Sequence, residues 1–364
     1  MAAAAATVGL VAGAGQGDDD ESTREPDRVE RPAATRAGGV SLERQVGSLL
    51  LMSYDGSEVP DYILRRLRAG QGSGVILFGP NAPDAETVRT ATGRMQRAAG
   101  GAALVTTDQE GGNIRSLAFA GPAVSQAGQP TPEAAAGAAR EGARALRDAG
   151  VNVNLAPVAD VASASGSVVA GRAFPGDPAT VAGLVASSVK AHDRERVATT
   201  IKHFPGLGDA TENTDDVSVT INTPRSELED VALDPFEAGI GAGAPLVMAS
   251  HALYPALDDE SIASQSRPVL QELLREELGF EGAVVTDSIE AQAVLDRSGV
   301  AEAAERSVQA GVDLVLMTGS GSWNEVYPRL LRRARSDPGF RERVAESAGR
   351  VLALKRRLGL TVDP

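Results

Sequence analysis

The stretch T-I-K-H-F-P-G-L-G-D-A-T-E-N-T-D-D-V-S, residues 200–218, is the most informative part of the chain for its fold. It begins as an apolar, β-branched strand, places Lys202 next to His203 where that strand ends, and then breaks into a Pro/Gly loop rich in carboxylates. Charged groups at the end of a buried strand need partners, because an unpaired charge is costly away from water. The pattern is typical of an active-site corner at the end of a barrel strand. The loop acids taken alone indicate only a solvated acidic loop.

Short apolar strands alternate with helical patterns on both sides of this stretch. Seven strands are visible, over residues 74–78, 102–108, 151–158, 198–204, 245–251, 282–287 and 312–318, and an eighth is expected within 46–52. Helical patterns lie between them, for example over 132–149, 178–194, 268–278 and 300–310. This alternation predicts βαβ units and a parallel sheet whose outer side is covered. The strand count favours an α/β fold of the TIM-type (β/α)8 barrel class, in a single domain, over a doubly wound sheet. No G-x-G-x-x-G follows the first strand, which argues against a dinucleotide-binding fold.

The chain of 364 residues divides into two parts. Residues 1–40 combine a signal-like Ala/Gly-rich segment, with Ala12-Gly13-Ala14 as a small-x-small cleavage site, and a polar tether expected to be disordered. The basic start of a signal peptide is missing, so a disordered tail in a cytoplasmic protein is the alternative to export. We favour export to the extracellular space or the cell envelope. The segment is too short for a membrane span. Residues 41–364 form the predicted barrel domain.

Composition argues against several classes of protein. The net charge of −14 argues against a nucleic-acid partner, since neutralising phosphates requires basic clusters. Cysteine is absent, which excludes disulfides, thiolate metal sites and a cysteine nucleophile. There is no H-x-H pair, and His192 falls on a predicted helix, where we expect an ordinary surface residue. We therefore expect no metal and no cofactor, with a metal-dependent barrel hydrolase as the weaker alternative. A monomer is expected.

Polar side chains follow five of the predicted strands at the points where they end. These residues are Asp108, Asp160, Lys202 with His203, His251, and Asp287 with Ser288. The C-terminal ends of barrel strands all face one side, so these groups are expected to converge on one pocket. One polar strand end is usually a helix cap, but five in one chain favour a functional pocket. Carboxyl groups with flanking donors suit the hydrolysis of glycosides.

Eight separate motifs, in this order and spacing, resemble those of glycoside hydrolase family 3. They are G-V-I-L-F (74–78), D-Q-E-G-G-N-I-R (108–115), N-L-A-P-V-A-D-V (154–161), G-R-A-F (171–174), K-H-F-P-G-L-G (202–208), M-A-S-H-A-L-Y-P (248–255), L-G-F-E-G-A-V-V-T-D-S-I (278–289) and A-G-V-D-L-V-L (310–316). The similarity is greatest to the single-domain bacterial β-N-acetylglucosaminidases (β-N-acetylhexosaminidases) of that family. It covers about residues 41–320.

The resemblance implies a TIM-type barrel, a carbohydrate substrate, no cofactor and a retaining mechanism. It implies that Asp287 is the nucleophile, which attacks the anomeric carbon and forms a glycosyl-enzyme. The residues implied to bind the sugar are Asp108, Arg172, Lys202 and His203. His251 is implied to lie close to them.

The loop after Lys202-His203 departs from the family pattern. The hexosaminidase branch reads K-H-F-P-G-H-G and, four residues later, D-S-H, whose Asp-His pair is its general acid/base. This chain has Leu207 instead of the second loop histidine, and Asn213-Thr214-Asp215 instead of Asp-Ser-His. A neutral amide cannot exchange a proton as a carboxylate does. We rank three hypotheses: Asp215 is the acid/base, a nearby acid (Asp209, Glu212 or Asp216) replaces it, or the protein binds sugar and turns it over poorly.

The sequence thus predicts a retaining exo-β-glycosidase that removes terminal β-linked N-acetylglucosamine, with Asp287 as nucleophile and Asp215 as acid/base. One alternative is a β-glucosidase or another β-glycosidase of the same family, because the altered loop weakens the N-acetyl assignment. The other is a sugar-binding protein with an impaired active site.

Overall fold

The computed structural model describes residues 39–361, and every structural statement below refers to that range. The predicted signal-like segment and nearly all of the predicted tether lie outside the described residues.

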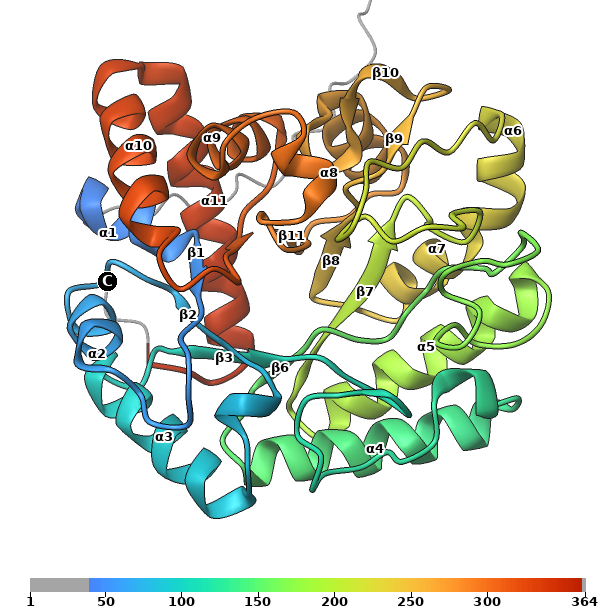
Figure 1. Ribbon diagram of the computed structural model, residues 1–364, viewed down its shortest axis with the longest axis horizontal. Helices are drawn as coiled ribbons and strands as arrows, with labels where there is room; N and C mark the ends of the chain where they lie inside the picture. The colour runs from blue at the N-terminus through green and yellow to red at the C-terminus, as the bar shows by residue number, and fades with distance from the viewer. Residues whose placement is uncertain (1–38, 362–364) are drawn as a thin grey trace, which may run out of the picture. The chain divides into compact units, whose positions relative to one another are not determined.

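Eight parallel strands form the centre of the fold. They are β1 (Leu50–Met52), β2 (Gly74–Leu77), β3 (Leu104–Thr107), β6 (Val153–Asn154), β7 (Ala198–Phe204), β8 (Leu246–Ala249), β11 (Ala283–Thr286) and β12 (Val315–Leu316). They pair in the order β11-β8-β7-β6-β3-β2-β1-β12, and a bridge from Val285 to Leu314 joins the two ends into a nearly closed barrel (Figure 1). All eight fall within the predicted strand ranges, so the predicted TIM-type barrel is confirmed.

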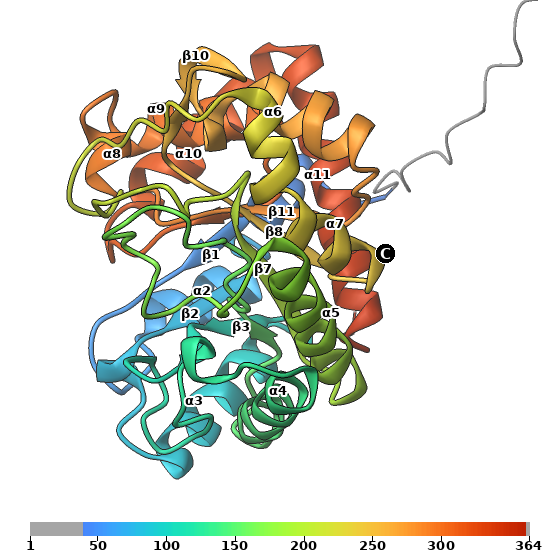
Figure 2. The same cartoon turned by 90° about the vertical axis from the view of Figure 1, so that its right-hand side faces the viewer.

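Helices surround the strands on the outside. They are α1 (Leu42–Ser48), α2 (Asp61–Arg68), α3 (Ala85–Ala98), α4 (Pro132–Asp148), α5 (Pro178–Arg194), α6 (Arg225–Glu227), α7 (Asp234–Gly241), α8 (Gln292–Leu295), α9 (Val300–Ala310), α10 (Trp323–Ser336) and α11 (Pro338–Arg357), with a π-type helix over Pro268–Glu277. Figure 2 shows α3, α4 and α5 along the outside of the strands. Helices α4 and α5 each begin with a proline behind a capping side chain, Thr131 or Asp177, which accepts a backbone N–H of the first turn.

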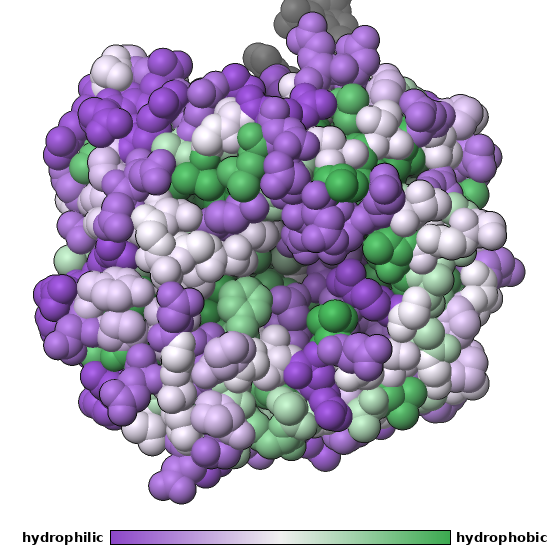
Figure 3. All heavy atoms as spheres, in the orientation of Figure 1, coloured by the Kyte–Doolittle hydropathy of each residue, from purple (hydrophilic) through white to green (hydrophobic). Residues whose placement is uncertain are grey.

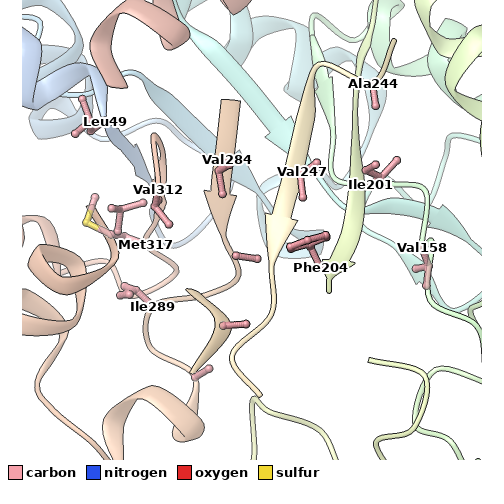
Figure 4. Close-up of a cluster of buried hydrophobic side chains, with 14 of the residues drawn as sticks. Leu49, Val158, Ile201, Phe204, Ala244, Val247, Val284, Ile289, Val312 and Met317 are labelled. Atoms are coloured by element: carbon pink, nitrogen blue, oxygen red, sulfur yellow. The ribbon is translucent and has the colours of Figure 1, made fainter. Parts of the chain in front are cut away.

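Alternate residues of each strand fill two separate apolar layers. In β8, Leu246 and Met248 belong to a cluster inside the barrel, whereas Val247 belongs to a larger cluster between strands and helices. Figure 4 shows Val247 beside Val284 and Ile201 in that outer layer. Because both sides of each strand are covered, the strands read as continuous apolar runs rather than as alternating ones.

Few large apolar side chains remain on the surface of the described residues. Those that are more than a third exposed are Phe119, Val124 and Leu295. In Figure 3 the apolar residues accordingly form small patches among hydrophilic ones. Two short antiparallel ribbons, β4 (Gln109–Gly111) with β5 (Ile114–Arg115) and β9 (Leu253–Tyr254) with β10 (Asp258–Ile262), follow β3 and β8. They lie in the loops that carry the polar strand ends.

Candidate active site

The polar ends of several strands meet at one cavity of about 370 Å³. Its lining comprises Ile76, Phe78, Asp108, Asp215, Asp287, Ser288, Glu290, Ala291, Leu316 and Thr318. Three of the predicted site residues, Asp108, Asp215 and Asp287, therefore line a single space although they come from distant parts of the chain. The convergence follows from the barrel, which directs the C-terminal ends of all strands to one side.

Two cations of the site, Lys202 and Arg172, are held by two carboxylates. Lys202 Nζ donates to Asp108 Oδ1 at 2.6 Å and lies 2.7 Å from Glu110 Oε1. Arg172 donates to both oxygens of Glu110, at 2.9 and 2.7 Å, a bidentate pair. Burial alone would raise the pKa of Glu110, but Lys202 and Arg172 outweigh it and hold the pKa at about 2. Burial would lower the pKa of Lys202, but Asp108 and Glu110 outweigh it and raise the pKa to about 12. Glu110 and Lys202 are therefore charged at neutral pH.

His203 stands between two aspartates. Its Nδ1 lies 2.7 Å from Asp160 Oδ2, and its Nε2 lies 3.9 Å from Asp287 Oδ2. Asp160 is fully buried, and its Oδ1 also accepts the backbone N–H groups of His203 and Leu207 at 3.0 and 2.7 Å. Asp160 therefore fixes both the imidazole ring and the start of the loop that follows β7.

Asp287 follows β11, and its carboxylate faces the cavity. Its Oδ1 accepts the backbone N–H of Ser288 at 2.8 Å, and its side chain is 23% exposed. Burial alone would raise the pKa of Asp287, but the charges of His203, His251 and Lys202 outweigh it and leave the pKa below its usual value. An ionised carboxylate on a cavity wall is suited to nucleophilic attack.

Asp215 reaches the same cavity from the loop between β7 and α6. Loss of surrounding water raises the pKa of Asp215, and the negative charge of Asp287 raises it further. The loop is fastened at this point, because the backbone N–H groups of Gln292 and Ala293 donate to the carbonyl oxygens of Asp215 and Thr214, both at 3.1 Å. Two carboxyl groups of one cavity thus have pKa values displaced in opposite directions.

Residues 41–354 match the family profile described as Glycosyl hydrolase family 3 N terminal domain. The chain belongs to glycoside hydrolase family 3. The family resemblance of the sequence motifs is therefore confirmed, and the convergence of strand ends on a carboxylate-lined cavity is the geometry of a glycoside hydrolase barrel.

Several known proteins are similar to this family 3 chain. A protein named uncharacterized secreted glycosyl hydrolase, from Arthroderma benhamiae, is 32% identical over 344 residues, which are 89% of this chain and 96% of the relative. A β-hexosaminidase from Xanthomonas oryzae pv. oryzae is 33% identical over 279 residues, 74% of this chain and 83% of the relative. The structure of a glycoside hydrolase family 3 β-N-acetylglucosaminidase from Paenibacillus sp. str. FPU-7 superposes with a TM-score of 0.84 at 32% identity over 89% of this chain. This chain covers 64% of the length of that structure.

Glu110 and Asp160 contact the candidate site residues, although Glu110 was not predicted and Asp160 was predicted only as one of the polar strand ends. Glu110 lies two residues after Asp108 on an extended segment, and residues two apart on such a segment point to the same side. That spacing is the signal that could have identified Glu110. Asp160 was noted only as a polar strand end, and its partner His203 is 43 residues away in sequence.

The other acids of the β7–α6 loop are placed away from the cavity. Asp209 accepts hydrogen bonds from the hydroxyls of Ser163 and Thr223, both at 2.5 Å, and so ties the loop to its own end and to the loop after β6. Glu212 and Asp216 are exposed, as is Asp215, but neither Glu212 nor Asp216 lines the cavity. Of the acids considered for the proton-transfer step, Asp215 is the one found among the lining residues of the cavity.

His251 is fully buried, and it contacts the segment that carries Asp287. Its Nε2 lies 2.9 Å from the carbonyl oxygen of Ser288, and its Nδ1 lies 2.7 Å from Ser264 Oγ. The carbonyl can only accept, so Nε2 carries a proton. Burial lowers the pKa of His251. Both ring nitrogens are bonded to protein atoms, and a direct contact between His251 and a sugar remains a prediction.

The expectation that His192 is a surface residue is wrong. The ring is 3% exposed, with Nδ1 at 3.0 Å from the Ser188 carbonyl oxygen and Nε2 at 3.1 Å from Asn154 Nδ2. Burial lowers the pKa of His192 to about 4, so the ring is neutral. Asn154 in turn bonds the backbone of Gln109, at 3.0 and 3.1 Å. His192 therefore supports the wall behind Glu110 rather than contacting solvent.

Proposed function

We propose that this chain is a retaining, exo-acting β-N-acetylhexosaminidase that removes terminal β-linked N-acetylglucosamine. The observation that carries the proposal is the pair Asp287 and Asp215, which line one cavity with their pKa values moved in opposite directions. A retaining glycosidase needs one ionised carboxylate as nucleophile and one protonated carboxyl group as acid. The name of the Xanthomonas relative favours a hexosamine, and the name of the Paenibacillus relative favours N-acetylglucosamine as the sugar.

In the first step Asp287 attacks the anomeric carbon while Asp215 gives its proton to the glycosidic oxygen. The bond between the anomeric carbon and that oxygen breaks, and a glycosyl ester forms on Asp287. In the second step Asp215, now ionised, takes a proton from water as the water oxygen attacks the anomeric carbon and releases the Asp287 carboxylate. General acid–base assistance of this kind contributes about 10²–10⁴-fold in rate.

The remaining polar groups would orient the sugar. Asp108 faces the cavity and would accept hydrogen bonds from sugar hydroxyls, while Lys202, which contacts Asp108, and Arg172, which contacts Glu110, would supply donors. His203 stands near the nucleophile with its other nitrogen held by Asp160. This arrangement stabilises a negative charge on Asp287 both before attack and on its release.

Hydrolysis of an aryl N-acetyl-β-glucosaminide and of an aryl β-glucoside, measured side by side, tests the proposal. Asp287→Ala is the blank, and Asp216→Asn, an exposed acid on the same loop, is the matched control. We expect turnover of the first substrate by the wild type and the control, and none by Asp287→Ala. Retained activity in Asp287→Ala, or sugar binding without turnover of either substrate by the wild type, would contradict it.

A β-glucosidase of the same family is the second candidate. It is favoured by Leu207 and Asn213, which replace residues that characterise the hexosaminidase branch. Leu207 is buried and Asn213 bonds Asp215, so neither supplies a titratable group to the cavity. A preference for the aryl glucoside in the same assay would select this candidate.

The location of the protein is inferred from its relatives. The protein from Arthroderma benhamiae is named as secreted, which supports export of this chain. Within residues 39–361 no helix has the length and apolar character needed to cross a bilayer. Export predicts a mature N-terminus shortly after Ala14 in the native host, and an intact Met1 there would contradict it.

A further inference from the structure

A second cavity, of about 360 Å³, lies at the end of the barrel opposite the active site. Its wall includes Ser48, Ser73 and Ala102, which precede β1, β2 and β3. The active-site residues follow the other ends of the strands, so the packed barrel interior separates the two cavities. Helix α11, which runs behind the strands in Figure 1, contributes Lys355 and the apolar side chain of Leu352 to the wall.

Lys355 is a buried cation of this cavity with little compensation. Its residue is 7% exposed, and its Nζ donates to the carbonyl oxygen of Ser73 over a long 3.3 Å bond. An ammonium group carries three donors, so this contact leaves capacity for further acceptors. Burial lowers the pKa of Lys355 to about 8, with a further contribution from the charge of Arg44. The amine is therefore still charged at neutral pH.

Two further donors belong to residues that line the same space. Ser73 is 1% exposed, and its hydroxyl has no hydrogen-bond partner among the described residues. Arg44 lines the cavity from α1, with its side chain lying against Gly70. None of the lining residues that the structure describes is acidic. The cavity wall thus carries two positive charges and a buried, unpaired hydroxyl, and no carboxylate balances them. A bound anion would accept hydrogen bonds from these donors and balance the charge.

The candidate active site contains a second buried lysine, Lys202, whose surroundings differ from those of Lys355. Lys202 is buried like Lys355, but it touches two carboxylates, Asp108 and Glu110. Those carboxylates raise the pKa of Lys202 to about 12, whereas the pKa of Lys355 falls to about 8. Lys202 therefore has carboxylate partners at the candidate active site. Lys355 has none among the described residues that line the second cavity.

We propose that this second cavity binds a small phosphate-type oxyanion between Lys355, Ser73 and Arg44. The oxyanion accepts from the ammonium, the hydroxyl and the guanidinium, and three donors from three elements suit a tetrahedral group better than a planar carboxylate. The cavity also has apolar wall residues, such as Leu67 and Leu352, which would contact the carbon part of an organic phosphate. The proposal does not depend on the proposed glycosidase activity.

Thermal unfolding and calorimetric titration with inorganic phosphate test this site, with sodium chloride at equal ionic strength as the reference. We expect phosphate to raise the unfolding temperature of the wild type beyond the effect of chloride, because a ligand of the folded state stabilises it. Lys355→Gln should weaken phosphate binding at least about tenfold, as expected for loss of a charge-assisted hydrogen bond. Lys190→Gln, at an exposed lysine on α5, is the matched control and should bind as the wild type does.

Ser73→Ala provides an independent arm, because removing an unpartnered hydroxyl leaves the fold intact if Lys355→Gln fails to fold. It should weaken phosphate binding by a factor of about 3 to 10 and leave aryl glycoside turnover unchanged. Glucose 6-phosphate should bind at least as tightly as phosphate, and acetate more weakly. A wild type that responds to phosphate and chloride alike, a Ser73→Ala variant that binds as the wild type does, or equal binding of acetate would overturn the proposal.

Discussion

The imidazole of His203 links two aspartates, with Nδ1 at 2.7 Å from Asp160 and Nε2 at 3.9 Å from Asp287. Asp160 is fully buried and also accepts two backbone N–H groups, so it holds the ring in one orientation. Asp287, on the other side of the His203 ring, is the proposed nucleophile. The electrostatic environment of the nucleophile is therefore set partly by a residue that does not line the cavity.

Asp160→Asn tests this positioning. An amide would place a donor against His203 Nδ1 and remove the carboxylate oxygen that lies 2.7 Å from it. We expect kcat to fall about 10- to 100-fold, the value of a lost charge-assisted hydrogen bond of about 1.5–3 kcal/mol, with a smaller change in KM. A fall in activity that merely follows a loss of folded protein would indicate a structural contribution alone.

Asp215→Asn tests the proton-transfer step. Substrates with poor leaving groups should slow by about 10²–10⁴-fold, because they depend on protonation of the glycosidic oxygen. Activated aryl glycosides should lose far less in their first step. Comparing kcat/KM for both substrate types in Asp215→Asn and in Asp216→Asn measures this. Equal losses on both substrate types would remove Asp215 from the acid function.

Glu110→Gln tests the pH dependence of stability. The pKa of Glu110 is about 2 in the folded protein against an ordinary value of 4.5. Its ionised carboxylate therefore stabilises the fold in full at pH values above 4.5. This contribution is lost as the pH falls from about 4.5 toward 2. The variant should be less stable at neutral pH, by about 3–5 kcal/mol, because Lys202 and Arg172 lose a buried partner.

Chemical denaturation of wild type and Glu110→Gln at a series of acidic pH values measures this effect. The difference in unfolding free energy between them should shrink as the pH falls through that window. Glu58→Gln, at an exposed glutamate, should follow the wild type throughout. A constant difference across the window would contradict the assignment of the charge to Glu110.

Lys355→Met tests the cost of burying an amine without a carboxylate. The pKa of Lys355 is lowered from 10.5 to about 8, so its charge destabilises the folded protein below pH 8 and this cost is relieved as the pH rises to 10.5. In phosphate-free buffer at neutral pH the variant should be more stable than the wild type, by roughly 2–3 kcal/mol at most. The gain should disappear at high pH. Thermal unfolding of Lys355→Met and of a Lys190→Met control checks both.

The barrel could be predicted from sequence because its strands are continuous apolar runs such as G-V-I-L-F, in which burial on both faces leaves a strong local signal. Strand ends such as Asp108 and Asp287 could be predicted because a barrel gathers them on one side. The contacts between them could not be predicted. Lys202 meets Asp108 across 94 residues of sequence, and no local pattern states which carboxylate a cation will meet.

His192, which was wrongly predicted to lie on the surface, shows that long-range contacts are equally hard to predict on a helix. Its burial follows from the face of α5 that packs inward, with Val185, Ser188 and Val189 also buried. The i, i+3 and i+4 spacing of those residues was present in the sequence, but a polar side chain on an inward face is recognised only when its partner is known. That partner, Asn154, lies on β6.

The backbone bonds from Gln292 and Ala293 to the carbonyls of Asp215 and Thr214 have a consequence for engineering. These hydrogen bonds join the segment that carries the proposed acid to the segment that follows the proposed nucleophile, so the two segments form one structural module. A loop transplanted from another family member would keep its geometry only if the first turn of α8 were exchanged with it. Chimaeras that divide this module should fail where chimaeras that move it whole succeed.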